Sequence, residues 1–251
     1  MEPLHIVAHM SEPVVYYGDG MHLDGILAWA KYTDLLPAEK SEVPPIIDPW
    51  ALDFDLPLRT WSVQSVTPEY MDDRLFVNRP RVRDGHKDGA LWGWCASAVH
   101  ADWLCDDRYA IRRKPEIEQM ARYTTSPSVN LGAGQQKATN ILMPAKFALE
   151  LHWYAVGDVV EVERLLTTHG RAVGKITTKG PGNVRRWEVE QWPRDWSVRR
   201  DCELARTMPI GFKEANGYVA EASIRPPYHH HSRIVMAMRP AFEELVPHAC
   251  A

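Results

Sequence analysis

Apolar runs and helical spacing predict the elements of the first half of the chain. Residues 4–10 form a short apolar run bounded by Ser-Glu-Pro, which predicts an opening strand. Apolar residues recur near helical spacing over 22–36 and predict a helix, which Pro37 ends. Two further runs, 59–66 and 90–99, have the composition of strands.

The second half of the chain predicts a strand, a helix and another strand in succession. Residues 149–157 have the pattern of a strand, and Asp158 and Gly170 are suited to begin and end a helix over 159–169. Residues 184–190 are rich in residue types that favour strands. The order strand, helix, two strands, an insertion, strand, helix and strand predicts an α+β, ferredoxin-like (RRM-like) sandwich with a long insertion.

The span 171–183, between that helix and the following strand, is predicted to be a glycine-rich loop. Its glycines tolerate positive φ and allow close backbone approach, and Pro181 stiffens the turn between two of them. Lysines bring charge into the loop, threonines add hydroxyl groups, and two arginines open the following strand. The residues with these properties are Gly174, Lys175, Thr177, Thr178, Lys179, Gly180, Gly182, Asn183, Arg185 and Arg186.

This loop is suited to bind a sugar-phosphate backbone, because phosphates most often accept hydrogen bonds from exposed backbone N–H groups and from Lys or Arg side chains. The alternative is an ordinary surface loop with solvated charges. The loop does not contain GxxxxGK[ST] or GxGxxG, and it follows a helix, whereas those nucleotide-binding motifs follow a strand.

Residues 106–146 form a second basic region. Basic side chains alternate there with Tyr109 and Tyr123, and a polar, glycine-bearing span follows. This pattern is typical of a basic hairpin or finger that extends from the body, and a surface loop without regular structure is the alternative. The basic residues of this region include Arg108, Arg112, Arg113, Lys114, Arg122 and Lys137.

The charge is distributed unevenly over an otherwise ordinary globular composition. The 251 residues are 45% hydrophobic and 25% charged, and they suffice for one large or two small domains. The net charge of −4 and the pI of 6.3 argue against a general nucleic-acid binder. However, residues 1–107 carry 8 Lys and Arg against 18 Asp and Glu, whereas residues 108–251 carry 21 against 15. A basic half on an acidic body suits specific capture of RNA or DNA within an assembly.

Neither a membrane anchor nor a disulfide framework is expected. No apolar run approaches the roughly 18–20 residues that span a bilayer, and the first residues lack the pattern of a signal peptide. The four cysteines form no CxxC pair, which favours reduced thiols in a cytoplasmic protein.

Histidines offer candidates for a metal site or for catalysis, and the sequence favours neither. The region after Trp192 is less regular and is predicted to include a strand over 232–239. Just before that strand, His229, His230 and His231 cannot all face one metal ion if the chain is extended, so packing or contact with RNA is the expected role. Other histidines have no Lys or Tyr partner at a spacing typical of a nuclease. These are His5, His9, His152 and His169.

Several segments of the chain resemble the RAMP superfamily of CRISPR-associated proteins. They are the run 152–158 with the helix after it, the span 174–190, the opening residues 1–9 and the run 23–28. More narrowly, these segments resemble the subunit that caps the 5′ end of the guide RNA in type IV effector complexes. The resemblance covers about 1–30 and 147–192, and the middle of the chain only by its layout.

The resemblance implies a RAMP fold with a glycine-rich loop, in a domain over residues 1–192 whose thumb-like insertion lies at about 106–146. Residues 193–251 are then an irregular C-terminal extension packed on the same domain. The resemblance also implies that the loop residues given above bind the 5′ handle of the crRNA, with no cofactor and no metal. Thumb residues implied in RNA binding are Arg108, Arg112, Arg113, Arg122 and Lys137. Tyr109, Tyr123 or Trp187 are candidates for stacking on bases, although core packing is the expected role of Trp187.

The implied partners are the backbone RAMP subunits and the large, target-adjacent subunit of the effector complex, with target DNA involved indirectly. The implied role is non-catalytic, contributes to guided DNA targeting and takes place in the prokaryotic cytoplasm without a membrane. Two alternatives stay open. One is a metal-independent endoribonuclease of the same superfamily that processes crRNA, and the other is a protein-interaction module without RNA contact.

Overall fold

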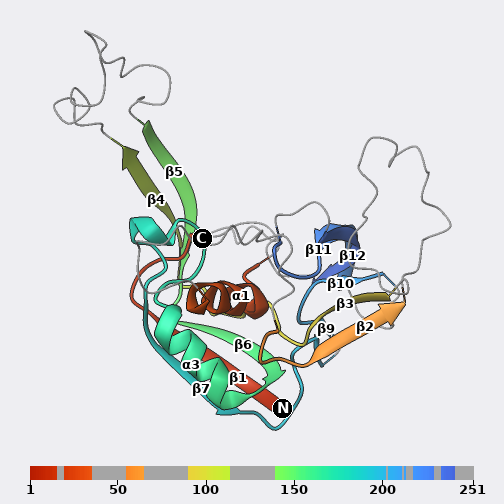
Figure 1. Ribbon diagram of the computed structural model, residues 1–251. Helices are drawn as coiled ribbons and strands as arrows, with labels where there is room; N and C mark the ends of the chain where they lie inside the picture. Colours follow the sequence, from red (N-terminus) through yellow and green to blue (C-terminus); the bar gives the residue numbers. More distant parts are fainter. Residues whose placement is uncertain are drawn as a thin grey trace, which may run out of the picture.

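The first strand of the chain lies at the centre of the main sheet. In the computed structural model, β1 (Glu2–Met10) is flanked by β6 (Glu150–Gly157) and β7 (Val184–Gln191), both antiparallel to it (Figure 1). The structure describes residues 1–15, 20–35, 55–64, 90–113, 139–201, 203–210, 212, 217–228 and 233–240. Within these residues the protein is α+β, with most elements strands in small antiparallel sheets. The strands predicted at 4–10, 149–157 and 184–190 are confirmed.

Alternate residues of β1 and β6 point into the core, because successive side chains of a strand face opposite sides. They form three cross-strand pairs, in which every residue is at most 1% exposed. These pairs are Leu4 with Ala155, Ile6 with Trp153 and Ala8 with Leu151. The indole N–H of Trp153 donates to the carbonyl of Met21 over 2.9 Å, which satisfies the polar atom of this large buried side chain.

A further segment extends the sheet beyond β6. The strand predicted at 90–99 is divided, because only β3 (Ala90–Trp94) pairs with β2 (Thr60–Gln64). At Cys95 the chain changes partner: the Cys95 amide donates to the residue before β2, and its carbonyl accepts from β6. Antiparallel bridges then join Ala96 and His100 to β6. The spatial order is therefore residues 95–100, β6, β1 and β7.

Two helices cover the buried face of this sheet (Figure 1). They are α1 (Leu23–Asp34) and α3 (Val159–His169), at the positions that the sequence predicts. The Asp158 carboxylate accepts from the amides of Val160 and Glu161 over 3.0 and 3.1 Å, so the predicted N-cap is confirmed. No helix in the described part of the chain has the length and apolarity to cross a membrane.

Gly170 follows α3 as predicted, but its φ of −81° lies outside the left-handed region. Glycine is required there by crowding, because a Cβ would lie 2.6 Å from the Leu166 carbonyl oxygen and 2.9 Å from the Trp187 indole nitrogen. That indole N–H donates to the Gly170 carbonyl over 2.6 Å. Trp187 is buried beside Trp153, so its predicted core packing is confirmed.

A two-stranded hairpin projects from the body in Figure 1. It consists of β4 (Cys105–Arg113) and β5 (Thr139–Phe147), which pair antiparallel along their whole length. The basic hairpin predicted at 106–146 is confirmed for these two strands. The residues between them, 114–138, lie outside the described part of the chain.

The C-terminal region adds two small antiparallel sheets. One has the order β10 (Met208–Pro209), β12 (Ile234–Pro240) and β11 (Gly217–Ser223), and the other pairs β8 (Arg199–Arg200) with β9 (Glu203–Leu204). The strand predicted at 232–239 is confirmed as β12. Before these sheets, Trp192 and Trp196 fold back onto Tyr154 on the open face of the main sheet, with ring centroids 5.9 and 4.9 Å from the Tyr154 ring.

Arg206 joins the C-terminal region to the first helix. Its side chain is fully buried, and its guanidinium lies 3.2 Å from the carboxylate of Asp24, which is also fully buried. The Tyr228 hydroxyl donates to the same carboxylate over 2.6 Å. Further hydrogen bonds from the guanidinium reach the backbone carbonyls of Trp94, Ala96 and Ile224.

Candidate nucleic-acid interface

The glycine-rich loop, residues 171–183, begins after α3 and ends where β7 begins. A backbone bridge between Ala172 and Asn183 closes its base, and the short 3₁₀ turn η4 (Thr177–Lys179) lies at its far end. All three glycines have positive φ, as predicted. The values are 92° at Gly174, 108° at Gly180 and 76° at Gly182.

The loop is held by residues 13–15, which we call the strap. The amide of Lys175 donates to the carbonyl of Val15 over 2.7 Å, and the amide of Gly182 donates to the carbonyl of Pro13 over 2.8 Å. The loop is therefore fixed at two separate points of its backbone.

These bonds change the prediction about the loop amides. The amides of Lys179 and Gly180 close the turn η4 over 2.8 and 3.1 Å, and those of Lys175 and Gly182 are taken by the strap. The prediction of exposed N–H groups is therefore wrong at these four positions. At these positions only side chains are left as donors for a phosphate.

Close packing explains why glycine occupies the loop where it meets the rest of the chain. A Cβ at Gly182 would lie 1.9 Å from the carbonyl oxygen of Val173, and a Cβ at Gly174 would lie 2.8 Å from that of Val15. Both positions also have positive φ, which side chains disfavour. Gly174 thus allows the loop to pack against the strap, and Gly182 allows the two arms of the loop to approach each other.

The strap and the loop both contact the hairpin. Val14 exchanges two backbone hydrogen bonds with Lys146 of β5, over 2.8 and 2.9 Å. Farther out, the Tyr109 hydroxyl on β4 donates to the carbonyl of Lys179 over 2.6 Å. Loop, strap and hairpin therefore form one hydrogen-bonded assembly, which the sequence alone does not indicate.

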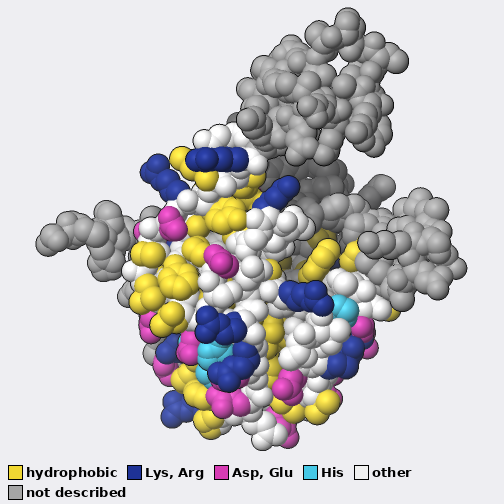
Figure 2. Space-filling model, turned by 90° about the vertical axis from the view of Figure 1, so that its left-hand side faces the viewer, with side chains coloured by type: hydrophobic (Ala, Val, Ile, Leu, Met, Phe, Trp, Pro, Cys, Tyr) yellow, Lys and Arg dark blue, Asp and Glu magenta, His cyan; other side chains and the backbone are white. Residues whose placement is uncertain are grey.

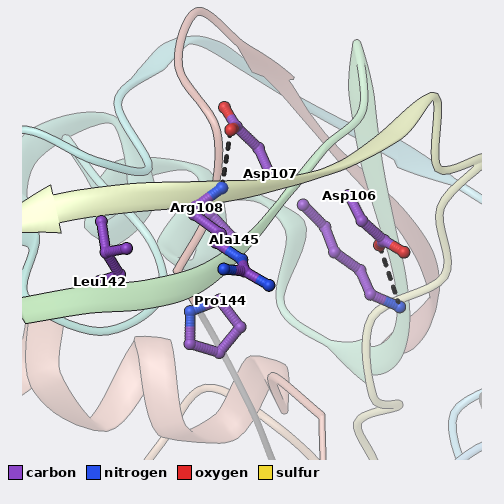
Figure 3. A pocket seen from close by; sticks show the side chains of 7 residues that line it. Asp106, Asp107, Arg108, Leu142, Pro144 and Ala145 are labelled. Carbon is purple, nitrogen blue, oxygen red and sulfur yellow. Dashed lines mark hydrogen bonds and ion pairs between the residues drawn. The ribbon is translucent and has the colours of Figure 1, made fainter.

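The predicted hairpin arginines face away from the loop. Arg108 and Arg112 alternate with Tyr109 along β4, so their side chains lie on the opposite face of the hairpin. On that face Arg108 lines an open pocket together with Leu142 and Pro144 of β5 (Figure 3). The pocket also contains the ion pair of Lys146 with Asp106 at 4.0 Å. Of Arg113 only the backbone, at the end of β4, is described.

The two arginines at the start of β7 lie at an irregularity of the sheet, because His9 pairs with Arg186 and Met10 pairs with Val184, which leaves Arg185 outside the register. Arg186 forms an ion pair with Glu188 at 2.6 Å and lies 3.3 Å from the His9 imidazole. Arg185 is exposed, and so is Lys179 in the loop. Within the described residues, no ion pair engages the side chains of Arg185, Lys179, Arg108 or Arg112.

Three histidines and three glutamates form a continuous network on the open face of the sheet. His5 contacts Glu190 at 2.8 Å and the imidazole of His152 at 3.1 Å. Next to this pair, His9 lies between Glu150 at 3.1 Å and Glu188 at 3.2 Å. Burial, together with the nearby charge of His5, lowers the pKa of His152. The alternation of histidines in β1 and glutamates in β7 is visible in the sequence but does not reveal their pairing.

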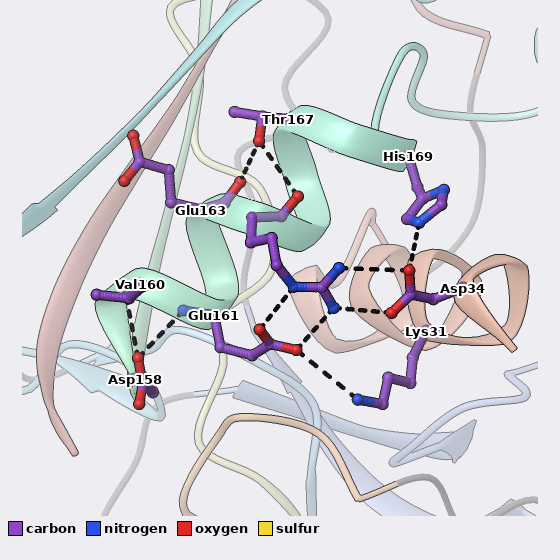
Figure 4. Close-up of polar contacts among 9 residues, drawn as sticks. Lys31, Asp34, Asp158, Val160, Glu161, Glu163, Thr167 and His169 are labelled. Carbon is purple, nitrogen blue, oxygen red and sulfur yellow. Dashed lines mark hydrogen bonds and ion pairs between the residues drawn. The ribbon is translucent and has the colours of Figure 1, made fainter.

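His169, another histidine considered for catalysis, belongs to a polar cluster between α1 and α3 (Figure 4). It lies 2.9 Å from Asp34, which also receives two hydrogen bonds from Arg164, at 3.3 and 2.7 Å. These hydrogen bonds, first from Arg164 and then from His169, hold the pKa of Asp34 well below its usual range. Arg164 also bonds Glu161 of its own helix. Because Asp34 belongs to α1, the cluster joins the two helices, and the guanidinium of Arg164 is already bound to carboxylates.

Basic side chains on the side of the molecule that faces left in Figure 1 are dispersed among acidic and apolar ones (Figure 2). Several predicted residues lie outside the described part of the chain. They are Lys114, Arg122, Tyr123, Lys137 and the three histidines at 229–231. Among the described residues, no group of His, Cys, Asp and Glu side chains has the arrangement of a metal site.

Comparison with known proteins identifies the family. The model of the family described as CRISPR type IV associated protein Csf3 matches residues 81–240, which is more than half of the 251-residue chain. The matched span includes the hairpin, β6, α3, the glycine-rich loop and β7. A search of curated proteins found no match. The chain therefore belongs to the Csf3 family of type IV CRISPR-associated proteins.

Proposed function

We propose that this component of a type IV CRISPR effector is its non-catalytic RNA-binding subunit, which grips the 5′ handle of the guide crRNA and caps the backbone filament. The observation that carries the proposal is the joined assembly of glycine-rich loop, strap and hairpin. Lys179 and Arg185 extend from the loop and the strand after it, and Arg108 and Arg112 from the hairpin, all exposed. Cationic side chains on a rigid backbone suit phosphate contacts, which position a nucleic acid without reading its sequence.

The strand order supports a ferredoxin-like RAMP fold for this subunit. In a ferredoxin-like domain, two strand–helix–strand units make an antiparallel sheet in which the first and last strands are neighbours. Here the first strand, β1, pairs with the last, β7, on one side and with β6 on the other, and residues 95–100 lie beyond β6. On this assignment, the domain over 1–192 includes the hairpin as its thumb, and residues 193–251 pack on the same domain through Arg206.

The proposal includes neighbours in the effector complex. Ile141 and Leu142 of the hairpin are about half exposed, at 49% and 55%, and Leu104 at its base is 60% exposed. Exposed apolar side chains beside basic ones suit a subunit interface. We assign this surface to contact with the backbone RAMP subunits, with the large subunit nearby and target DNA bound indirectly through the complex.

A non-catalytic role is supported by the contacts that the imidazole nitrogens of the candidate histidines already make. Both ring nitrogens of His5 and of His9 already contact carboxylate or imidazole groups, and His169 is bound to Asp34. A general base for RNA cleavage has to reach the 2′-hydroxyl of the substrate. Incubation of the purified protein with precursor repeat RNA in the absence of metal tests this point, and cleavage would establish the nuclease alternative.

The first experiment is to purify the tagged protein from cells that also express its genomic neighbours and a repeat array, and to sequence the RNA that it retains. A single RNA species with a uniform, repeat-derived 5′ end is expected. Partner proteins without any RNA would instead favour a protein-interaction module.

A matched pair of charge reversals then tests the site itself. Arg185→Glu is expected to reduce the retained RNA, and Lys179→Glu with Arg185→Glu to abolish it, because each change replaces a phosphate-binding cation by an anion. Arg194→Glu is the control, since Arg194 is also an exposed arginine but lies beyond β7 and outside the loop. Equal RNA retention by the double variant and the control would contradict the assignment of the loop.

A further inference from the structure

The hydrogen bond between Tyr109 and Lys179 joins two parts of the molecule that are far apart in the sequence. Tyr109 lies in the middle of β4, and its hydroxyl donates to the backbone carbonyl of Lys179, at the end of η4, over 2.6 Å. Its ring extends from the face of β4 opposite to Arg108 and Arg112. The contact therefore uses the main chain of the loop and leaves the side chains of Lys179, Arg108 and Arg112 available.

Gly180 provides the space for this contact. A Cβ on Gly180 would lie 3.0 Å from the Tyr109 hydroxyl oxygen, and the φ of 108° at this residue disfavours any side chain. The loop thus presents its bare backbone to the tyrosine at this point. An ordinary surface loop with solvated charges would not require a glycine beside a tyrosine hydroxyl at this point.

The base of the hairpin is fixed as well, through the strap. Lys146 at the base of β5 bonds Val14, while Val15 and Pro13 bond the loop. Tyr109 adds a second attachment farther out along the hairpin, so two points define its direction relative to the loop. Without the Tyr109 contact, the strap would be the only one of these two attachments left.

We propose that Tyr109 is a positioning residue, which holds the hairpin against the glycine-rich loop so that the cations of both bind one RNA strand as a single site. This inference rests on the proposed function. If the hairpin is already fixed against the loop before RNA binds, binding does not have to include the entropy cost of ordering it. Phosphate contacts to the loop then favour phosphate contacts to the hairpin, and the affinity rises. Within the described residues β4 pairs with β5 alone, so an RNA backbone reaching both groups crosses the uncovered edge of β4.

The test is the affinity of the full-length protein for a fluorescein-labelled RNA with the sequence of the repeat, measured by anisotropy at several salt concentrations. Tyr109→Phe removes one oxygen atom and is expected to weaken binding about fivefold, the effect of one hydrogen bond. It is also expected to reduce the slope of log Kd against log salt, because fewer phosphate contacts form together. Tyr218→Phe is the control, since Tyr218 is 44% exposed on β11.

A double-mutant cycle separates positioning from simple loss of stability. The pair Arg108→Ala with Arg112→Ala is introduced into the wild-type protein and into Tyr109→Phe. If Tyr109 positions the hairpin, the arginine pair weakens binding less in the Tyr109→Phe background than in the wild type. Equal factors in the two backgrounds, or wild-type affinity of Tyr109→Phe, would overturn the inference.

Amide hydrogen exchange gives a readout that needs no RNA. In Tyr109→Phe the amides of residues 177–180 are expected to exchange faster than in the wild type and in Tyr218→Phe, and unchanged exchange would also refute the positioning role. The outcome for the proposed function is separate. If Lys179→Glu with Arg185→Glu abolishes RNA binding and Tyr109→Phe does not alter it, only the role of Tyr109 fails. If that double variant has no effect, the proposed function fails first.

Discussion

At the scale of single residues, a buried histidine, His100, links the stability of the fold to pH. His100 bridges to β6 through its backbone, and its ring lies 5.9 Å from that of Tyr154. Its Nε2 atom is buried and has no hydrogen-bond partner among the described residues. Burial, and then the positive charges of Arg200 and His152, lower the pKa of His100 to about 4. The folded protein therefore holds this imidazole neutral in mildly acidic solution.

We predict that His100 makes the fold sensitive to acid. Its pKa falls from 6.5 in the unfolded chain to about 4 in the folded protein, so the unfolded state binds the proton more readily between these values. The free energy of unfolding should thus decrease as the pH falls from 6.5 towards 4, by at most about 3 kcal/mol. Urea unfolding at pH 7 and pH 4.5 measures the loss.

His100→Gln is the comparison for this measurement, because glutamine is neutral at both pH values. The decrease should be clearly smaller in that variant. An equal decrease in the variant and the wild type would assign the acid sensitivity to other groups, of which His152 has a pKa shifted in the same direction.

At the scale of elements, local signals in the sequence account for the helices. Asp158 is both the residue that the sequence predicts as N-cap and the one whose carboxylate accepts two backbone amides of α3. The apolar spacing of α3 also corresponds to its buried residues Val162, Leu165 and Leu166. Local rules suffice here because both the cap and the apolar face depend on residues within a few positions.

We predict that Asp158→Ala lowers the free energy of unfolding by about 1 kcal/mol, because two amides at the start of α3 lose their acceptor. Asp158→Asn should retain most of the stability, since the amide oxygen accepts the same hydrogen bonds. Glu163→Ala, at an exposed position within the same helix, is the control. Thermal or urea unfolding of the three variants decides the matter, and equal stability of Asp158→Ala and Glu163→Ala would contradict the prediction.

Elements that depend on distant partners were harder to predict. The division of the strand at 90–99 occurs at Cys95, where the chain exchanges β2 for β6, and no local pattern marks that exchange. For the candidate site, the sequence correctly predicted the positive φ of Gly174, Gly180 and Gly182 but also predicted exposed loop amides. The strap at 13–15 lies more than a hundred residues before the loop, so the partners of those amides were not visible in the sequence.

At the scale of the whole molecule, one buried arginine connects regions that the sequence presents as separate. Arg206, from the C-terminal region, bonds Asp24 of α1, the carbonyl of Trp94 at the end of β3 and that of Ala96 just after it. Burial raises the pKa of Asp24, and the nearby charge of Arg206 and the Tyr228 hydroxyl offset part of that rise. The C-terminal region therefore takes part in the same structure as the first helix.

We predict that Arg206→Met destabilises the protein by about 3–5 kcal/mol, because it leaves the Asp24 carboxylate buried without a cation. Combining it with Asp24→Leu should restore a large part of the stability, since neither charge then remains in the core. Urea unfolding of the two single variants and the double variant measures the coupling between these residues. Additive losses would show that the two side chains do not stabilise the fold as a pair.

The central position of β1 also has a consequence for synthesis on the ribosome. β1 is made before both of its partners, which lie much later in the chain, at residues 150–157 and 184–191. Its apolar residues therefore have no partner strand until β6 and β7 have been translated, and contacts between distant residues form slowly. A translational pause between residues 157 and 184 would leave a nascent chain in which β1 has only one of its two neighbours, with an edge open to aggregation.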